Sequence, residues 1–351
     1  MDLATVTNGE RQRRMNHIRK AKKILTIGGG TGTYTVLSGL KKYPEHMVEP
    51  VAVVSMADSG GSTGRLRDQF GYLPVGDVRM ALVALAGETD NPLLRQLFLH
   101  RFDKGEGISG HNFGNLLLVA LTDILGSEEA AIEAAGRILR IAGKVLPVTT
   151  ENVNLVAKYS DGSVVEGEGY IDDECESDNP PAIIDVWLTP EAQLNPRVAE
   201  EISTADMVVL GPGDLYTSIL PNVVVNGMPE ALKETPAILV YVSNLMTKHG
   251  QTDGLSAMEH AAILSEYIGR LPDVILQNNA PYPEDLLKLY ESEREFPVRD
   301  DLTEEDKVRV IRADFISDVP VEQAKGDVLR RSLLRHDSDK LAKAIMNLLD
   351  E

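Results

Sequence analysis

The amino-acid sequence predicts an α/β fold in which a mainly parallel sheet carries helices on both faces. Short apolar, β-branched runs alternate with segments of helical periodicity, and this alternation is typical of parallel sheets. Glycine-rich polar segments follow several of the runs directly. With 351 residues, 43% of them hydrophobic, the chain is long enough to bury one large core or two ordinary ones.

The first half of the chain supplies two predicted strands and a series of helices. The strands are continuous apolar runs at residues 23–28 and 48–56, as expected for strands buried on both faces. The helices have apolar residues at helical spacing and cover residues 33–42, 76–100, 112–125 and 128–141. We expect residues 76–100 to form two helices, broken near Asn91-Pro92, because proline ends or kinks a helix.

The second half begins with a different pattern. Residues 152–171 alternate polar and apolar around Asp161-Gly162, which predicts a β-hairpin, and the acidic loop 172–181 follows. Further strands are predicted at residues 182–188, 205–211 and 237–243, with helices between them. No linker rich in Pro, Gly or Ser divides the chain. We therefore expect a single α/β domain at residues 22–351 with a hairpin insertion, preceded by a basic, disordered tail at residues 1–21.

Composition and charge exclude several classes of protein. The formal net charge is −19, although residues 1–23 carry seven Lys or Arg against two acidic residues. The net negative charge of the remaining residues argues against a nucleic-acid partner. The basic N-terminal segment would either contact an anionic surface or be a solvent-exposed, disordered extension. The single cysteine, Cys175, excludes an intrachain disulfide framework, zinc ribbons and CxxC redox motifs. No apolar run reaches the roughly 18 residues of a membrane span, and we expect a cytoplasmic protein.

Five polar, glycine-rich segments lie at the ends of predicted strands or just before helices. They span residues 28–33, 57–67, 107–115, 210–222 and 242–254. In an open parallel sheet all strands end at one edge, and ligands bind in the crevice outside these carboxyl ends. We therefore expect the five segments to converge on one cleft. Their convergence supports a ligand site more strongly than any single motif does.

The first segment places four glycines in the five positions from Gly28 to Gly32, between a strand and a helix. Glycine allows positive φ and close approach to backbone N–H groups, and a helix N-terminus adds partial positive charge. Together they predict a phosphate site, such as that of a nucleotide. The segment lacks the Gly-Lys-Ser/Thr of a Walker loop, and the third glycine of GxGxxG would fall at Thr33. A tight strand-to-helix turn is the alternative.

Asp58 stands at the end of the second predicted strand, and a further glycine-rich loop follows it. An acid at this position binds the ribose in dinucleotide folds. Between two phosphate-type loops it could instead hold Mg²⁺, which prefers carboxylate and phosphate oxygens, or cap the next helix. The neighbouring residues favour a role in a site: Gly60, Gly61, Ser62, Thr63, Gly64 and Arg65.

Histidines and lysines give weaker indications. His111 lies between Gly110 and a helix start, where a structural role and a functional one are equally consistent with the sequence. No HExxH spacing predicts zinc, and no GxSxG predicts a nucleophilic serine. Lys248 and His249 lie in a loop and either bind an anion or are solvated.

The order of these motifs resembles a known family. "GGGTG", "ADSGGSTGRLR", "GDVRMALVALA", "GHNFGN", "GPGDLYTSILPN" and "NLMTKHGQTDG" are similar to the YvcK-type gluconeogenesis factors, part of the CofD-like group named for 2-phospho-L-lactate transferase. The resemblance runs from about Lys22 to the C-terminal "RHDSDKLAKAIMNLL".

This resemblance implies a three-layer, Rossmann-like fold and a cytoplasmic protein that binds UDP-sugars, notably UDP-N-acetylglucosamine or UDP-glucose. Such proteins support growth and cell shape on gluconeogenic carbon sources, and no settled catalytic activity goes with them. The related transferases instead move a phospholactyl-type group to a deazaflavin with Mg²⁺. A homo-oligomer and an unidentified protein partner are also expected.

The resemblance also implies site residues, and three neighbours depart from the family pattern. Ser59 replaces a second acid or amide after Asp58, which weakens the expectation of a metal; Met80 replaces Asn, and Gln251 replaces Glu. The ligand-binding residues expected from the motifs are Gly28, Gly29, Gly30, Thr31, Gly32, Asp58, Gly60, Gly61, Ser62, Arg65, Asp77, Arg79, His111, Asn112, Asn115, Gly211, Gly213, Asn244 and Thr252, with Asp58 as the candidate Mg²⁺ ligand.

Overall fold

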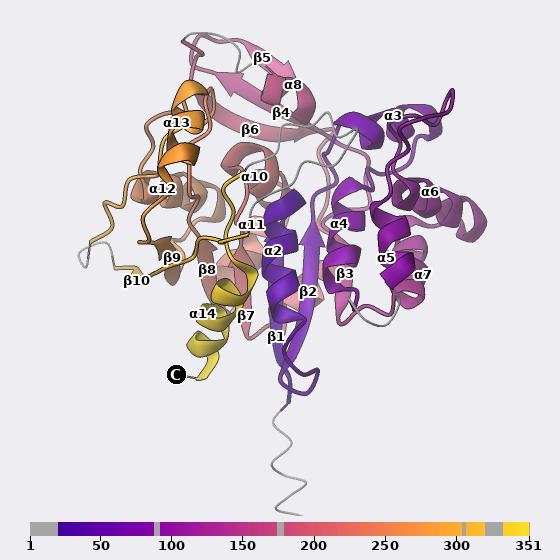
Figure 1. The fold of residues 1–351 in the computed structure, drawn as a ribbon, viewed down its shortest axis with the longest axis horizontal. Coiled ribbons are helices and arrows are strands. Elements are labelled where there is room, and N and C mark those ends of the chain that lie inside the picture. The colour runs from indigo at the N-terminus through magenta and orange to yellow at the C-terminus, as the bar shows by residue number, and fades with distance from the viewer. Residues whose placement is uncertain (1–19, 88–91, 174–178, 304–306, 320–332, 351) are drawn as a thin grey trace, which may run out of the picture.

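A seven-stranded parallel sheet forms the centre of the protein (Figure 1). The computed structural model describes residues 20–87, 92–173, 179–303, 307–319 and 333–350. In spatial order, the strands are β10 (Arg309–Ala313), β9 (Val274–Asn278), β8 (Ile238–Val242), β7 (Met207–Leu210), β1 (Lys22–Gly28), β2 (Val48–Val54) and β3 (Lys144–Pro147). The predicted mainly parallel α/β fold is confirmed.

A second, three-stranded antiparallel sheet lies beyond the carboxyl ends of the central strands, at the top of Figure 1. Its order is β5 (Val164–Glu166), β4 (Asn154–Tyr159), β6 (Ile183–Thr189). The predicted hairpin is therefore present as β4 and β5. The strand expected at residues 182–188 pairs with β4 in this small sheet rather than entering the parallel one.

Helices fill both faces of the large sheet because the strand residues alternate between the faces. Ile24 joins a core with residues of α2 and α14, whereas Leu25 and Ile27 join the core formed with the helices of the opposite face. Gly39 permits close packing of α2 on α14, since a Cβ there would lie 2.0 Å from the Ser338 carbonyl oxygen. The result is the expected layering of helices, sheet and helices.

In the first half of the chain the predicted helices are present, and α3 is an additional helix that the sequence pattern did not predict. The expected break near Asn91-Pro92 separates α4 from α5, and residues 88–91 lie outside the described residues. The helical elements are α2 (Gly30–Leu40), α3 (Gly61–Phe70), α4 (Gly76–Leu85), α5 (Pro92–Leu99), α6 (Phe113–Leu125), α7 (Glu128–Leu139), α8 (Glu168–Asp173), α9 (Pro196–Ser203), the π-helix η2 (Leu215–Ile219), α10 (Leu220–Val223), α11 (Met228–Glu234), α12 (Ala257–Ile268), α13 (Glu284–Ser292) and α14 (Ser338–Asp350).

Some boundaries differ from the expectation. Helix α2 starts at Gly30, three residues earlier than expected, so the glycine segment itself forms its first turn. Residues 168–171, expected to continue the hairpin, belong to helix α8. The predicted tail at residues 1–21 and the acidic loop with Cys175 fall largely outside the described residues.

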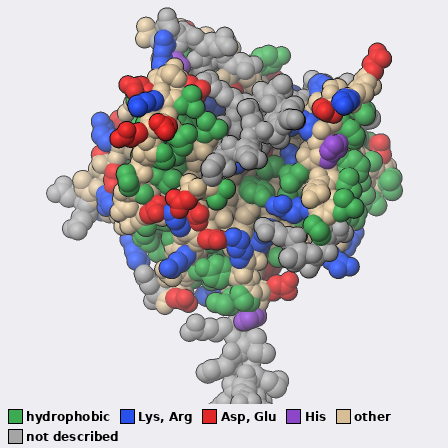
Figure 2. All heavy atoms as spheres, viewed as in Figure 1, with side chains coloured by type: hydrophobic (Ala, Val, Ile, Leu, Met, Phe, Trp, Pro, Cys, Tyr) green, Lys and Arg blue, Asp and Glu red, His purple; other side chains and the backbone are tan. Residues whose placement is uncertain are grey.

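Apolar side chains gather on the right of Figure 2. Helices α5 and α6 carry exposed apolar side chains, among them Leu93 and Ile124. Within the described part of the chain, no helix is both long enough and apolar enough to traverse a bilayer.

Candidate functional site

Strand β1 lies where the strand order reverses. From β1 the chain passes through α2 to β2 and β3 on one side, and it returns much later to β7 on the other side. Ligands of open α/β sheets bind at such a switch point, outside the carboxyl ends. Two of the glycine-rich segments meet here, Gly28–Gly32 after β1 and Gly211–Gly213 after β7.

The glycines of the first segment face three different environments. A Cβ on Gly32 would lie 1.7 Å from the Pro212 carbonyl oxygen, so this glycine allows the two segments to pack together. A Cβ on Gly29 would lie 2.3 Å from Asp77 Oδ2. Gly30 has φ +54°, and no atom of the described residues lies within 4 Å of the place its Cβ would take. Of these three glycines, Gly30 therefore leaves space for a ligand.

The first turn of α2 presents backbone N–H groups at this open side. Gly30 N donates to Asp77 Oδ1 over 2.8 Å, and the N-cap Gly29 offers no side-chain cap. The N–H groups of Thr31 and Gly32 have no partner within the helix, because the first turn of any α-helix lacks one. Together with the partial positive charge of the helix end, they suit an anion.

The carboxylates of Asp58 and Asp77 hold the backbone of two glycine loops, the one after β2 and the one after β1. Asp58 Oδ1 accepts from Gly60 N over 2.8 Å, just as Asp77 Oδ1 accepts from Gly30 N. A Cβ on Gly76 would lie 2.6 Å from Asp58 Oδ2, so the start of α4 packs directly on Asp58. Each carboxylate thus fixes the backbone of one loop.

A third carboxylate, Glu168 of α8, joins these two to form what we call the acidic cluster. A Cβ on Gly60 would lie 3.4 Å from Asp58 Oδ1 and 3.8 Å from Glu168 Oε2. Burial, followed by the charge of Asp58, raises the pKa of Asp77 from 3.8 to about 7. Burial also raises the pKa of Asp58, and burial with the charge of Asp58 raises that of Glu168. Burial therefore disfavours the charged form of all three carboxylates.

Several predicted site residues form a hydrogen-bonded group that supports the loop after Asp58. Arg79 Nε donates to Asn115 Oδ1 over 2.8 Å, and Asn115 Nδ2 donates to Ser62 Oγ over 3.4 Å. Ser62 Oγ also lies 3.1 Å from His111 Nδ1, and Asn112 Oδ1 caps α6 by accepting from Gly114 N. These side chains are at least nine-tenths buried and engaged with one another.

Within this supporting group, His111 is held neutral. Burial, and then the charges of Arg65 and Arg101, lower its pKa. Arg65 itself is exposed and turns toward residues 107–115, where its guanidinium donates to the Ser109 carbonyl. The segment 107–115 therefore reaches the site through the α3 loop and not directly from a strand end.

The loop after β8 reaches the second glycine segment. Asn244 Nδ2 donates to the Gly213 carbonyl oxygen over 2.8 Å, and Tyr241 Oη donates to Asn244 Oδ1. Thr252 Oγ1 accepts from Lys248 N over 2.8 Å and thereby shapes the loop. Asn244 and Thr252 thus brace the backbone around the switch point.

Three charged residues of this region, Glu168, Asp172 and Asp214, are not among the predicted site residues. Lys248 Nζ lies 2.8 Å from Asp172 Oδ1 and 2.7 Å from Asp214 Oδ2. The sequence pattern places Glu168 in the hairpin and Asp172 in the acidic loop. Asp214 and Lys248 fall in two of the five segments expected to converge, and Lys248 is predicted either to bind an anion or to be solvated.

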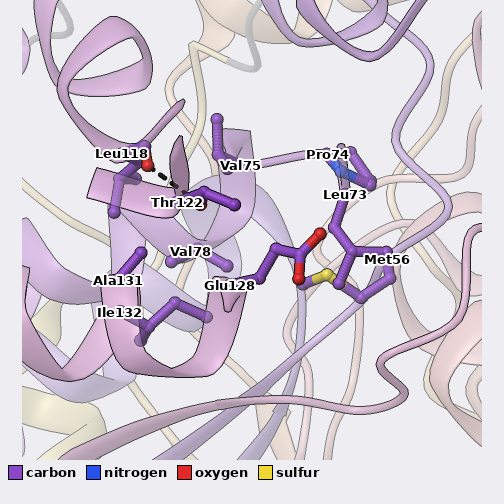
Figure 3. Close-up of a pocket in the computed structure, with 10 residues that line it drawn as sticks. All are labelled: Met56, Leu73, Pro74, Val75, Val78, Leu118, Thr122, Glu128, Ala131 and Ile132. Atoms are coloured by element: carbon purple, nitrogen blue, oxygen red, sulfur yellow. Dashed lines mark hydrogen bonds between the residues drawn. The ribbon is translucent and has the colours of Figure 1, made fainter. Parts of the chain in front are cut away.

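A small pocket lies elsewhere, between α4, α6 and α7 (Figure 3). Its walls are almost entirely apolar, with Met56, Val78 and Leu118 among them. The hydroxyl of Thr122, one of its two polar side chains, donates to the Leu118 carbonyl oxygen. We place the candidate site at the switch point because the polar groups converge there.

Known proteins resemble this chain over most of its length. The family model described as 2-phospho-L-lactate transferase CofD matches residues 24–316. The gluconeogenesis factor of Halalkalibacterium halodurans is 39% identical over 93% of this chain and 96% of its own length. That of Bacillus subtilis is 39% identical over 94% of this chain and 98% of its own length.

A crystal structure gives the same result for the fold. It is that of a member of the UPF0052 family from Bacillus halodurans, which superposes with a TM-score of 0.83 at 38% identity and covers 93% of this chain and 99% of that protein.

Proposed function

This chain belongs to the family of 2-phospho-L-lactate transferase CofD and, within it, to the gluconeogenesis factors, and from this premise we propose that it is a regulatory protein that binds a nucleotide sugar. The ligand we propose is UDP-N-acetylglucosamine or UDP-glucose. Through its occupancy, the protein would support growth and cell shape on gluconeogenic carbon sources. We further propose that it works in the cytoplasm as a homo-oligomer and acts on a protein partner.

The observation that carries the proposal is the open face of Gly30 at the switch point. The N–H groups of Thr31 and Gly32 have no partner within α2, and they adjoin Gly30, whose would-be Cβ has no atom of the described residues within 4 Å. A diphosphate suits these donors and the positive end of the helix. The asparagines near this place are engaged in supporting bonds, so we assign the phosphates, and not the base, to the first glycine segment.

Titration of the protein with nucleotide sugars tests the proposal. We expect UDP-N-acetylglucosamine or UDP-glucose to bind with a dissociation constant of about 1 µM, equivalent to roughly 8 kcal/mol. A ligand at a hundred times its dissociation constant should add about 2.7 kcal/mol of apparent stability. GDP and ATP serve as controls. Calorimetry without heat for either UDP-sugar, while a control nucleotide binds, would refute the proposal.

The alternative function is a Mg²⁺-dependent transferase of the 2-phospho-L-lactate type, for which Asp58 and Asp77 are the candidate ligands. Carboxylate oxygens are the ligands Mg²⁺ prefers, and a cation would stabilise the charged forms of these two groups, whose pKa values are raised mainly by burial. Within the described residues, no group of three or more His, Cys, Asp or Glu is arranged to hold a metal ion. Asp58 and Asp77 would hold the ion, which would neutralise charge on a reacting diphosphate.

Asp58→Asn separates the two functions. In a transferase, the change should abolish phospholactyl transfer to a deazaflavin while most ligand binding remains. In a nucleotide-sugar sensor, it should weaken UDP-N-acetylglucosamine binding, because the second loop loses its carboxylate, and EDTA should leave wild-type binding unchanged. Binding that disappears in EDTA would favour the transferase.

A further inference from the structure

Two side chains of the loop after β8 donate to one and the same carboxylate oxygen. Lys248 Nζ lies 2.8 Å from Asp172 Oδ1, and Gln251 Nε2 lies 2.7 Å from it. The two donors lie in the loop that follows strand β8 of the large sheet. Asp172 lies in helix α8, which contacts strands β4 and β5 of the small sheet. Asp172 Oδ1 thus accepts hydrogen bonds from an ammonium group and from an amide group. Phosphate oxygens are commonly bound in proteins by the same kinds of donor.

The donor pair stands beside the switch point. Lys248 Nζ also donates to Asp214 Oδ2 over 2.7 Å, and Asp214 directly follows the second glycine segment. Asn244 holds the carbonyl oxygen of Gly213 in the same segment. The ammonium is therefore located next to the backbone that meets the first turn of α2.

The position of the donors does not depend on α8. The backbone N–H groups of Gln251 and Thr252 both donate to the Lys248 carbonyl oxygen, over 3.1 and 2.8 Å. The Thr252 hydroxyl closes the turn by accepting from Lys248 N. The turn thus fixes the backbone of Lys248 and Gln251 through local bonds, and Asp214 would still hold Lys248 Nζ if Asp172 moved away.

The Gln251 amide is only half satisfied. Its side chain is 5% exposed, and among the described residues its Oε1 has no hydrogen-bond partner. A buried acceptor without a partner is costly, and a ligand hydroxyl or N–H group would satisfy it.

Helix α8 is itself in an unfavourable electrostatic position. It brings Glu168 close to Asp58, and after burial the charges of Asp58, Asp172 and Asp77 raise the pKa of Glu168. Lys248 is the cation that offsets this repulsion at Asp172. A competing anion on Lys248 would leave α8 without that attraction.

We propose that Lys248 Nζ and Gln251 Nε2 form an anion-binding site for a diphosphate, and that Asp172 occupies this site until the ligand displaces it. The inference rests on the proposed function for the nature of the ligand. Ligand binding and docking of α8 on the β8 loop then exclude each other. Occupancy of the cleft is thereby converted into a movement of α8, which a protein partner could recognise.

Inorganic pyrophosphate is the probe, because it carries the diphosphate without base or sugar. Its affinity is measured by calorimetry for wild type, Lys248→Met and Asp172→Ala. Lys144→Met is the matched control, since Lys144 also lies between two carboxylates, Glu49 and Glu201, but at the amino edge of the sheet. We expect Lys248→Met to weaken binding at least tenfold, Asp172→Ala to tighten it about three- to tenfold, and Lys144→Met to bind as wild type.

Asp172→Ala decides the question if Lys248→Met fails to fold. Unchanged or weaker pyrophosphate binding by Asp172→Ala overturns the inference, as does equal binding by Lys248→Met and Lys144→Met. In wild type, pyrophosphate should raise amide hydrogen exchange in residues 168–172, and unchanged exchange contradicts the displacement.

A parallel titration with UDP-N-acetylglucosamine separates this inference from the proposed function. If pyrophosphate behaves as expected but the nucleotide sugar does not bind, the anion site stands and the proposed function fails. If the nucleotide sugar binds wild type and all variants equally, the proposed function stands and the anion site fails.

Discussion

Replacing Gly30 by valine is the sharpest test of the phosphate turn. The Cβ and its two methyl groups would enter the open space on the one side of the turn that the protein leaves free. Gly30 also has φ +54°, a conformation that a β-branched residue rarely adopts. The change should therefore have two separable effects, strain in the backbone and obstruction of the ligand.

The size of each effect follows from the local structure. Strain at a positive φ costs on the order of 1–3 kcal/mol of folding stability. Obstruction removes at least one charged hydrogen bond between a backbone N–H and a phosphate, worth roughly 1.5–3 kcal/mol. Since about 1.4 kcal/mol corresponds to a factor of ten, affinity for a nucleotide sugar should fall about 10- to 150-fold.

Gly126→Val is the matched control for this test. Gly126 ends α6 with φ +69°, and no atom lies within 4 Å of its would-be Cβ. It stands at the far end of a helix about 20 Å long from Asn112. Thermal unfolding should show a similar loss of stability in both variants, and calorimetry should show lost affinity only in Gly30→Val. Equal affinities in the two variants would refute the assignment of the turn to a phosphate.

Other changes probe the remaining features. Gly32→Ala should lower stability by about 1–3 kcal/mol or more in thermal unfolding, because its Cβ would overlap the Pro212 carbonyl oxygen; wild-type stability would contradict the packing of the two segments. The pKa of Asp77 is raised from 3.8 to about 7, mainly by burial and then by the charge of Asp58. Between about pH 4 and pH 7 the folded protein therefore binds more protons than the unfolded chain. Stability should thus fall as pH rises from about 4 to 7, on the order of 4 kcal/mol in full, and urea titrations in EDTA should show a flatter profile for Asp77→Asn. Deleting residues 1–20, which lack apolar periodicity, should leave melting temperature and ligand affinity intact, and an insoluble product would disprove this.

The central strands β1, β2, β7 and β8 were predictable because burial on both faces leaves a continuous apolar run. β9, although it is buried throughout, and the short β3 were not predicted. The edge strand β10 has no such run: its sequence RVIRA places arginines at partly or fully exposed positions, and it was missed. Helix α3 was taken for a loop because GSTGRLRDQF has no apolar stripe, so contacts with the rest of the fold stabilise it.

The candidate site was predictable only in part, for a related reason. The glycine segments and Asp58 are recognisable because they follow strands directly. The pairing of Lys248 with Asp172 joins residues 76 positions apart across two sheets, and no local pattern encodes it. Gly32 illustrates a further limit. Glycine is required at this position because Pro212, 180 residues later in the chain, packs against it. The sequence around Gly32 does not show whether glycine serves this packing or contact with a ligand.

The adjacency of β1 and β7 also has a consequence for synthesis of the chain. The segment Gly28–Gly32 leaves the ribosome some 180 residues before Pro212, which at about 5–20 residues per second is a delay of roughly 10–40 s. During this interval β1 can pair with β2 but has an open edge on its other side, and exposed strand edges promote aggregation. Until β7 is synthesised, the nascent N-terminal half cannot complete its sheet, and the open edge of β1 favours aggregation.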